Sequence, residues 1–123
     1  MLYFTSDLHL GDEKVLISRS GRPFSNIEEM NNTIIDNINS VVGADDELWI
    51  LGDFAFRVDK IEVQKFRNRI NCRNVHLVYG NHDQDYSQER IFQSVQYYKE
   101  LKTPYGIVVL FHYPIMEWYG ASG

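Results

Sequence analysis

The sequence predicts an α/β protein with a largely parallel sheet, and three observations lead to that class. Short β-branched and aromatic runs at 2–5, 47–51 and 75–79 have the composition of strands. A stretch with helical periodicity lies between the first two runs, and a second helical stretch lies between the last two. The resulting order of strand, helix, strand, helix, strand favours right-handed crossovers and a sheet that is covered by helices.

The first helix is predicted to follow Pro23. Ser25 is a good N-cap, and Glu28 three residues later completes a capping-box pattern. Gly43 is the expected stop. The spacing of three and four predicts one apolar stripe made of Ile27, Met30, Ile34, Ile38 and Val41.

A second helix is predicted to open at Asp59 with Glu62, and its buried positions include Ile61, Phe66 and Ile70. The remainder of the chain has a different character. Residues 95–101 have strand composition, 103–106 form a turn signal, and 107–111 are apolar. We therefore expect a β-hairpin near the end, followed by a flexible tail over 120–123.

Length, charge and cysteine usage narrow the class of protein. A chain of 123 residues with 44% hydrophobic residues suits one domain around one core. The formal charge of −5 argues against a general nucleic-acid or membrane-surface binder. Cys72 is the single cysteine, which excludes an internal disulfide. With no signal peptide or membrane-spanning stretch in this sequence, we expect a cytoplasmic protein.

Four polar clusters each follow a predicted strand, and this agreement of position is the strongest functional signal. The clusters are Asp7 with His9, then Gly52-Asp53, then residues 80–83, then His112. In an open α/β sheet, ligands bind at the carboxyl ends of the strands. We therefore expect polar groups from four strand ends to converge on one site.

The residue types in these clusters indicate a metal site. Asp7 and His9 are two residues apart, so extended backbone would place both side chains on one side. Carboxylate oxygen and imidazole nitrogen together suit Mn, Fe, Zn or Ni. A carboxylate such as Asp53 can bridge two cations, while Gly52 and Gly80 allow tight turns close to the site.

Each of these residues alone has an ordinary structural interpretation. Asp7 could end a strand, Asp53 and Asn81 could be turn residues, and His112 could be a core histidine. Their order, with each cluster placed after a strand, favours the shared site over those separate interpretations.

Several neighbouring residues keep two interpretations. Arg22 is a candidate fork donor to a substrate phosphate, although a surface or capping role is favoured. Asp12 is expected to be solvated, with a role supporting the first cluster as the alternative. Phe54 and Phe56 either wall a pocket or pack in the core. His76 lies inside a strand pattern and is expected to be structural.

The ordered set resembles the calcineurin-like metallophosphoesterase family. D-x-H matches residues 7–9, G-D matches 52–53, G-N-H-D matches 80–83, and the later histidine matches His112. The stretches 22–24 and 52–54 look like small bacterial and phage members. The resemblance implies a layered α/β/β/α sandwich formed as a single domain over residues 1–123.

The resemblance also implies roles and chemistry. Asp7 and His9 would hold a first divalent metal, Asp53 would bridge, and Asn81 and His112 would hold a second. His82 would donate a proton to the leaving group, and Asp83 would be an orienting residue. The expected activity is hydrolysis of small phosphate mono- or diesters by a hydroxide that two metals activate.

One expected motif is missing from the sequence. The family normally ends its site with G-H-x-H, and no histidine follows His112 here. The resemblance then implies three protein ligands for each metal and a C-terminally shortened fold without its last strands. Three hypotheses follow: a homodimer through an open sheet edge near Trp118 and Tyr119, a truncated or non-catalytic binding or scaffold protein, and a fragment of a longer enzyme.

Overall fold

The computed structural model describes residues 1–17 and 22–112 of the chain. Its main sheet is parallel and has four strands in the order β1-β2-β3-β4. These strands are β1 (Leu2–Thr5), β2 (Glu47–Leu51), β3 (Asn74–Val78) and β4 (Ser94–Gln96). The helices are α1 (Lys14–Ile17), α2 (Ile27–Val41) and α3 (Lys60–Arg69), and an antiparallel hairpin follows from β5 (Lys99–Thr103) and β6 (Gly106–Leu110). The α/β class and the parallel order predicted from the sequence are therefore confirmed.

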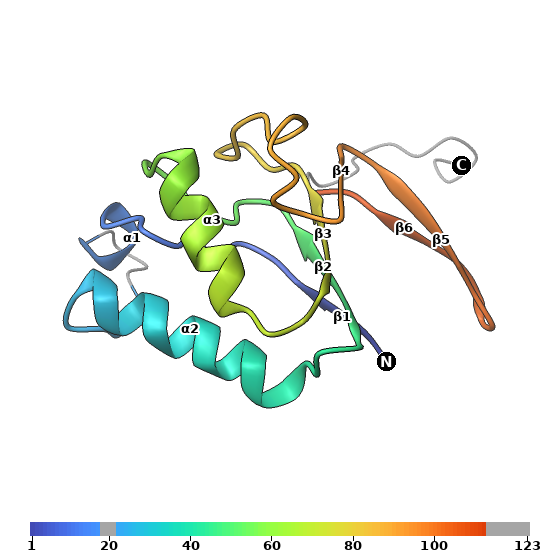
Figure 1. Cartoon of the computed structure of the whole chain (residues 1–123), viewed down its shortest axis with the longest axis horizontal. Coiled ribbons are helices and arrows are strands. Elements are labelled where there is room, and N and C mark those ends of the chain that lie inside the picture. The colour runs from blue at the N-terminus through green and yellow to red at the C-terminus, as the bar shows by residue number, and fades with distance from the viewer. Residues whose placement is uncertain (18–21, 113–123) are drawn as a thin grey trace, which may run out of the picture.

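The helices and the hairpin lie on opposite faces of the main sheet (Figure 1). The two faces follow from the alternation of side chains along a strand. In β2, Leu48 and Ile50 join the large core cluster on the helical side, whereas Trp49 and Leu51 join a smaller cluster with Leu110 of the hairpin. The described part of the chain thus forms three layers of helices, parallel sheet and hairpin.

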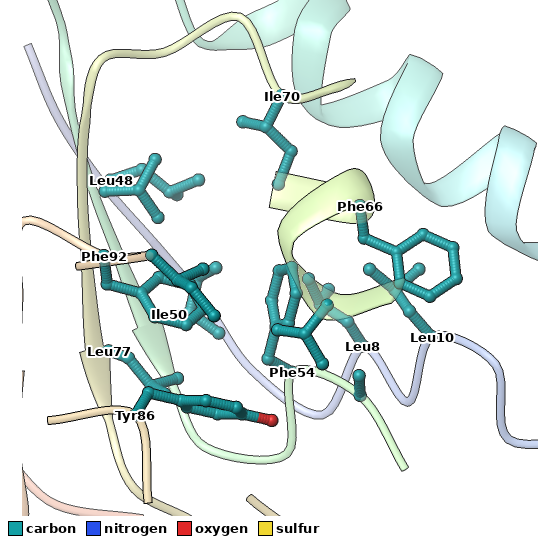
Figure 2. Packing of buried hydrophobic residues seen from close by; sticks show 14 of the residues in the cluster. Leu8, Leu10, Leu48, Ile50, Phe54, Phe66, Ile70, Leu77, Tyr86 and Phe92 are labelled. Carbon is teal, nitrogen blue, oxygen red and sulfur yellow. The ribbon is translucent and has the colours of Figure 1, made fainter. Parts of the chain in front are cut away.

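The large core reaches into the loops that follow β1 and β2 (Figure 2). Leu8 and Leu10 after β1, and Phe54 after β2, are buried among side chains that include Phe66 and Phe92. Burying one such side chain contributes roughly 1.5–3 kcal/mol. These loops carry polar cluster residues between apolar ones, so the core itself fixes where the polar side chains stand.

Two details of α2, which is the first helix predicted from the sequence, differ from the expectation. The N-cap is Asn26, whose side chain accepts a hydrogen bond from the Glu29 backbone N–H at 2.8 Å, so the predicted cap at Ser25 is wrong by one residue. The Glu29 carboxylate then accepts from the Ser25 N–H at 3.1 Å. Ser and Asn are both good caps, and the spacing to Glu28 or Glu29 does not separate them.

The predicted buried faces of the two long helices are confirmed in part. In α2, Met30 and Ile35 are buried and Ile34 and Ile38 pack partly buried against the core, but Val41 is exposed, so its predicted burial is wrong. The α3 cap at Asp59 is confirmed, since its carboxylate accepts from the Glu62 N–H at 2.9 Å. In contrast Ile61 is 68% exposed, so its predicted burial is wrong. Phe66 and Ile70 are buried as expected.

The predicted strand at 95–101 divides into two. Its first part belongs to β4, which pairs with β3, and its second part belongs to β5, which pairs with β6 in a different sheet. The turn over 103–106 and the hairpin are confirmed. The one-turn helix α1 was not predicted from the sequence, since four residues carry little periodic signal.

Some expectations fall on parts of the chain that the structure does not describe. Trp118 and Tyr119, on which the homodimer hypothesis rests, and the tail over 120–123 lie outside the described residues. Within the described residues, no helix is long and apolar enough to span a membrane.

Candidate metal centre

The loops after β1 and β2, which carry Asp7, His9 and Asp53, are joined by backbone hydrogen bonds. The Asp7 N–H donates to the Gly52 carbonyl at 2.9 Å, and the His9 N–H donates to the Asp53 carbonyl at 3.0 Å. A bridge between Leu10 and Ala55 continues this pairing. The two loops therefore act as one unit, and the side chains of Asp7, His9 and Asp53 are brought together on it.

The backbone of this unit is not extended. Asp7, His9 and Asp53 have φ angles of 54°, 53° and 54°, in the left-handed region that non-glycine residues seldom adopt. The expectation that extended backbone places Asp7 and His9 on one side was wrong in its reason, although their side chains do meet. Strain of this kind costs on the order of 1–3 kcal/mol per residue and gathers at functional sites.

The Asp53 carboxylate lies between two imidazole rings. Its Oδ2 atom is 3.4 Å from His9 Nε2 and 3.7 Å from His112 Nε2. Asp7 Oδ1 lies 3.9 Å from the same His9 nitrogen. The four side chains converge from the ends of β1, β2 and β6, which are three of the four strand ends that the sequence clusters indicated.

The donor set can be tested against the needs of a divalent cation. Asp7, Asp53 and His112 each offer one ligand atom, and these atoms lie within 4.8 Å of one another. Bonds of about 2.0–2.2 Å place two ligands of one metal within about 4.4 Å of each other. Small side-chain movements therefore suffice, and the mixture of oxygen and nitrogen donors suits Mn, Fe, Zn or Ni.

Both histidines are oriented by a second hydrogen bond. His9 Nδ1 is 2.9 Å from Asp12 Oδ2, and His112 Nδ1 is 2.9 Å from the Leu51 carbonyl oxygen. Because a carbonyl can only accept, His112 Nδ1 carries the proton, and the Asp12 carboxylate, as an acceptor, favours the same tautomer of His9. In each ring Nε2 is then left as the acceptor, and it faces Asp53. This arrangement is typical of metal-ligating histidine.

Asp12 contributes more to the site than its position in the sequence indicates. It was expected to be solvated, yet it is buried, and its second oxygen accepts from the Lys14 backbone N–H at 3.1 Å. The signal available in the sequence was its spacing of three residues from His9, which is within reach in a tight loop.

Asp83 organises the backbone beneath the site. Its carboxylate accepts hydrogen bonds from the N–H groups of Asp53 at 2.7 Å, Phe54 at 2.9 Å and Gly80 at 2.9 Å. Burial raises the pKa of the Asp83 carboxyl, and the three N–H donors oppose that rise. These contacts favour the orienting role expected for Asp83.

The two glycines of the site stand where a side chain would collide. A Cβ on Gly52, which has a φ of 90°, would overlap the His112 ring, and a Cβ on Gly80 would overlap the Asp53 carboxylate and backbone. The close approach expected at these glycines is therefore present. Each one makes room for a predicted metal ligand.

The remaining predicted residues have different placements. The His82 N–H donates to Asp53 Oδ1 at 2.9 Å, and its exposed ring lies 5.6 Å from the His9 ring, centre to centre. Asn81 is exposed, and among the described residues no contact joins its amide to the four converging side chains. The Arg22 guanidinium donates to the carbonyls of Asp7 and Leu8, which favours a role in holding the ligand loop.

Fold and site together define an α/β protein with a candidate divalent-metal centre at the carboxyl ends of its strands. Residues 2–121 match the family model described as calcineurin-like phosphoesterase, and the chain belongs to that family. The family resemblance drawn from the sequence motifs is therefore confirmed.

The names of three similar proteins state no activity. The chain is 36% identical over 94 residues to the uncharacterized protein MJ1445 of Methanocaldococcus jannaschii and 34% identical over 90 residues to the gene 66 protein of Mycobacterium phage L5. These alignments cover 75% and 72% of this chain. A crystal structure of the AQ665 protein of unknown function from Aquifex aeolicus matches with a TM-score of 0.77, at 28% identity, over 95% of this chain.

The chain spans only part of each of these relatives. The matches cover 52% of the archaeal protein, 42% of the phage protein and 62% of the Aquifex chain. What the whole protein does is therefore a matter for proposal.

Proposed function

We propose that this chain is a single phosphoesterase domain that hydrolyses phosphate mono- or diesters with the help of divalent metal ions. The observation that supports this most is the Asp53 carboxylate held between the Nε2 atoms of His9 and His112. In this proposal Asp7 and His9 hold one cation, Asn81 and His112 hold a second, and Asp53 is shared. Bound cations would supply an acidified water and would neutralise phosphoryl oxygens.

The protein's own residues prepare this chemistry before any substrate arrives. Asp53 has one oxygen committed to the His82 N–H, so its other oxygen remains directed at the two imidazoles. Asp12 and the Leu51 carbonyl hold those imidazoles in the ligating tautomer. The side chains need little rearrangement, which favours tight and specific positioning of a phosphoryl group.

His82 is the proposed general acid. Its ring is exposed beside the centre, while its backbone is fixed to Asp53, so the ring can approach the oxygen of a departing alcohol. General-acid help of this kind is worth about 10²–10⁴ in rate. Its value should depend on the leaving group, because an acidic phenol departs without a proton and an alkyl alcohol does not.

The test is hydrolysis of bis-p-nitrophenyl phosphate by metal-stripped protein titrated with Mn²⁺. We expect turnover that requires the metal and that disappears in Asp53→Asn. His82→Gln should leave a nitrophenyl ester nearly unaffected and slow an alkyl ester by about 10²-fold or more. Saturable Mn²⁺ binding without turnover of any ester would instead support the non-catalytic binding protein considered from the sequence.

A further inference from the structure

Two hollows adjoin the candidate metal centre. The larger, of about 450 Å³, is lined by Asp12, Lys14, Val15, Phe56, Arg57 and His82. The second, of about 370 Å³, is lined by Gly11, Glu13, Lys14 and Arg57. Because Lys14 and Arg57 border both, the hollows meet at these two cations. Volumes of this size are within the range that small-molecule sites occupy.

Two residues that line the larger hollow contact predicted metal ligands. Asp12, on its wall, is hydrogen-bonded to His9, and His82, also on its wall, is bonded through its N–H to Asp53. If His82 protonates the departing oxygen, the leaving group must extend past His82. The structure thus places this hollow where the leaving group of a substrate would lie.

The hollow offers both an apolar wall and positive charge. Phe56 lies 4.1 Å from His82, ring centre to ring centre, and the Arg57 guanidinium carbon lies 5.1 Å from the Phe56 ring centre. Lys14 and Arg57 are exposed, and among the described residues neither forms an ion pair. The nearest carboxylate inside the larger hollow, Asp12, is already committed to His9.

The backbone at Arg57 provides an independent reason to suspect a ligand. Its φ is 61°, a left-handed conformation that a long side chain adopts at a cost and that glycine or asparagine adopts readily. The side chain at this position is nevertheless a guanidinium over an aromatic ring, at the mouth of a hollow. Such outliers gather where a ligand is clamped.

We propose that the natural substrate has a leaving group that carries a second, anionic phosphate together with a flat or apolar body, which is the chemistry of a nucleotide. Lys14 and Arg57 bind that phosphate, and Phe56 with Val15 packs against the body. This proposal rests on the proposed phosphoesterase function. In the reaction, water adds to the scissile phosphorus, the P–O bond to the leaving group breaks, and the departing oxygen takes a proton from His82.

The test compares thymidine 3′-monophosphate with thymidine 3′,5′-bisphosphate, both cleaved at the 3′ position in the presence of Mn²⁺. We expect a larger kcat/KM for the bisphosphate, whose departing nucleoside retains a 5′-phosphate. The double variant Lys14→Gln with Arg57→Asn should lose about tenfold or more on the bisphosphate and change less than about twofold on the monophosphate. Asparagine is chosen because it tolerates the positive φ.

Two further variants separate charge from disruption. Arg57→Lys should keep most of the preference, since it retains a cation. Lys65→Gln is the matched control, because it removes an exposed cation of α3 that, among the described residues, forms an ion pair with Glu62. An equal loss on both substrates in the double variant, or no loss on either, would overturn the proposal.

A binding measurement without turnover distinguishes failure of this inference from failure of the proposed function. Calorimetric titration of metal-free protein with each thymidine phosphate should show about tenfold tighter binding of the bisphosphate, with the difference lost in the double variant. If no ester is hydrolysed, the phosphoesterase proposal fails, but this titration still shows whether the hollow binds the second phosphate. Equal affinities of wild-type protein for the two ligands would show that the hollow does not bind the second phosphate, even if the protein hydrolyses esters.

Discussion

Replacing Asp12 by asparagine tests whether this buried carboxylate prepares His9 to bind metal. Asp12 accepts two hydrogen bonds, from His9 Nδ1 at 2.9 Å and from the Lys14 N–H at 3.1 Å. Asparagine keeps the shape but has one accepting oxygen. Its NH₂ group must then face either Lys14 N–H, a donor against a donor, or His9 Nδ1, which would move the ring proton to Nε2.

The size of the effect follows from these contacts. If the proton moves to Nε2, that nitrogen can no longer donate its lone pair to a metal until the tautomer is restored. If the proton stays, the His9 Nδ1–H loses the carboxylate acceptor that fixes the orientation of the ring. Removing a partner of this kind typically lowers metal affinity 10- to 100-fold, which is about 1.4–2.8 kcal/mol.

The assay is calorimetric titration of stripped protein with Mn²⁺, paired with thermal unfolding to show that the variant is folded. The matched control is Asp45→Asn, which removes an exposed carboxylate that pairs with Arg73 on the surface. An Mn²⁺ affinity within twofold of wild type in folded Asp12→Asn protein would refute the role given to Asp12. A loss of similar size in Asp45→Asn would show that net charge, and not the His9 contact, sets the affinity.

Gly52, Asp83 and His76 can each be tested by a substitution or a change of pH. Gly52→Ala should lower both the unfolding temperature and Mn²⁺ affinity, because the new Cβ overlaps the His112 ring and φ is 90°. Asp83→Asn should cost about 1–3 kcal/mol in urea unfolding, because one buried N–H loses its acceptor. Burial lowers the pKa of His76, so the unfolded chain binds its proton more readily, and stability should fall as pH drops through about 6.5.

Each of these predictions has a control variant or an outcome that would contradict it. Gly106→Ala shares a positive φ, at 129°, but its Cβ meets open space, so it should destabilise without changing metal affinity. For Asp83→Asn, an unchanged urea midpoint would mean that the backbone donors find other partners. His76→Gln should flatten the pH dependence between about 5 and 7, and a slope that persists in that variant would assign the effect to other groups.

The surroundings of His76 bear on the sign of that pH effect. Glu47 lies 2.9 Å from Nε2 and raises the pKa of His76, whereas Lys99 on the hairpin lowers it along with burial. Burial is the largest influence, so the folded pKa lies below the usual value of about 6.5. Stability contributed by neutral His76 is therefore present above that value and is lost below it.

The positions of most strands and helices are predictable from the sequence, because strands and helix caps carry local signals. Asp59 is a helix cap in both the prediction and the structure, and the strand over 47–51 matches β2 to the residue. The division of 95–101 into two sheets could not be read from composition, since it depends on which neighbour each half meets. Local propensity predicts that a segment is a strand, but tertiary contacts determine which strand it pairs with.

The same limit explains which parts of the site were found. The ordered clusters revealed Asp7, Asp53 and His112 because each follows a strand, and strand ends share one edge of the sheet. The contact between Asp12 and His9 occurs where the His9 backbone is left-handed. The residue types in that loop do not predict this conformation. An aspartate three residues from a histidine is common in sequences, so the spacing alone does not predict that the two side chains are hydrogen-bonded.

The strain of the left-handed backbone at Asp7, His9 and Asp53 is offset by burial of the residue that follows each of them. Asp7, His9 and Asp53 are each followed by a residue that is buried in the core: Leu8, Leu10 and Phe54. Burial of each is worth roughly 1.5–3 kcal/mol, which is comparable to the strain of one left-handed residue. The core thus offsets the strain during folding, before any cation binds. Metal affinity then need not be spent on ordering these loops, so a cavity made by Leu10→Ala should weaken Mn²⁺ binding as well as stability, although Leu10 offers no ligand atom.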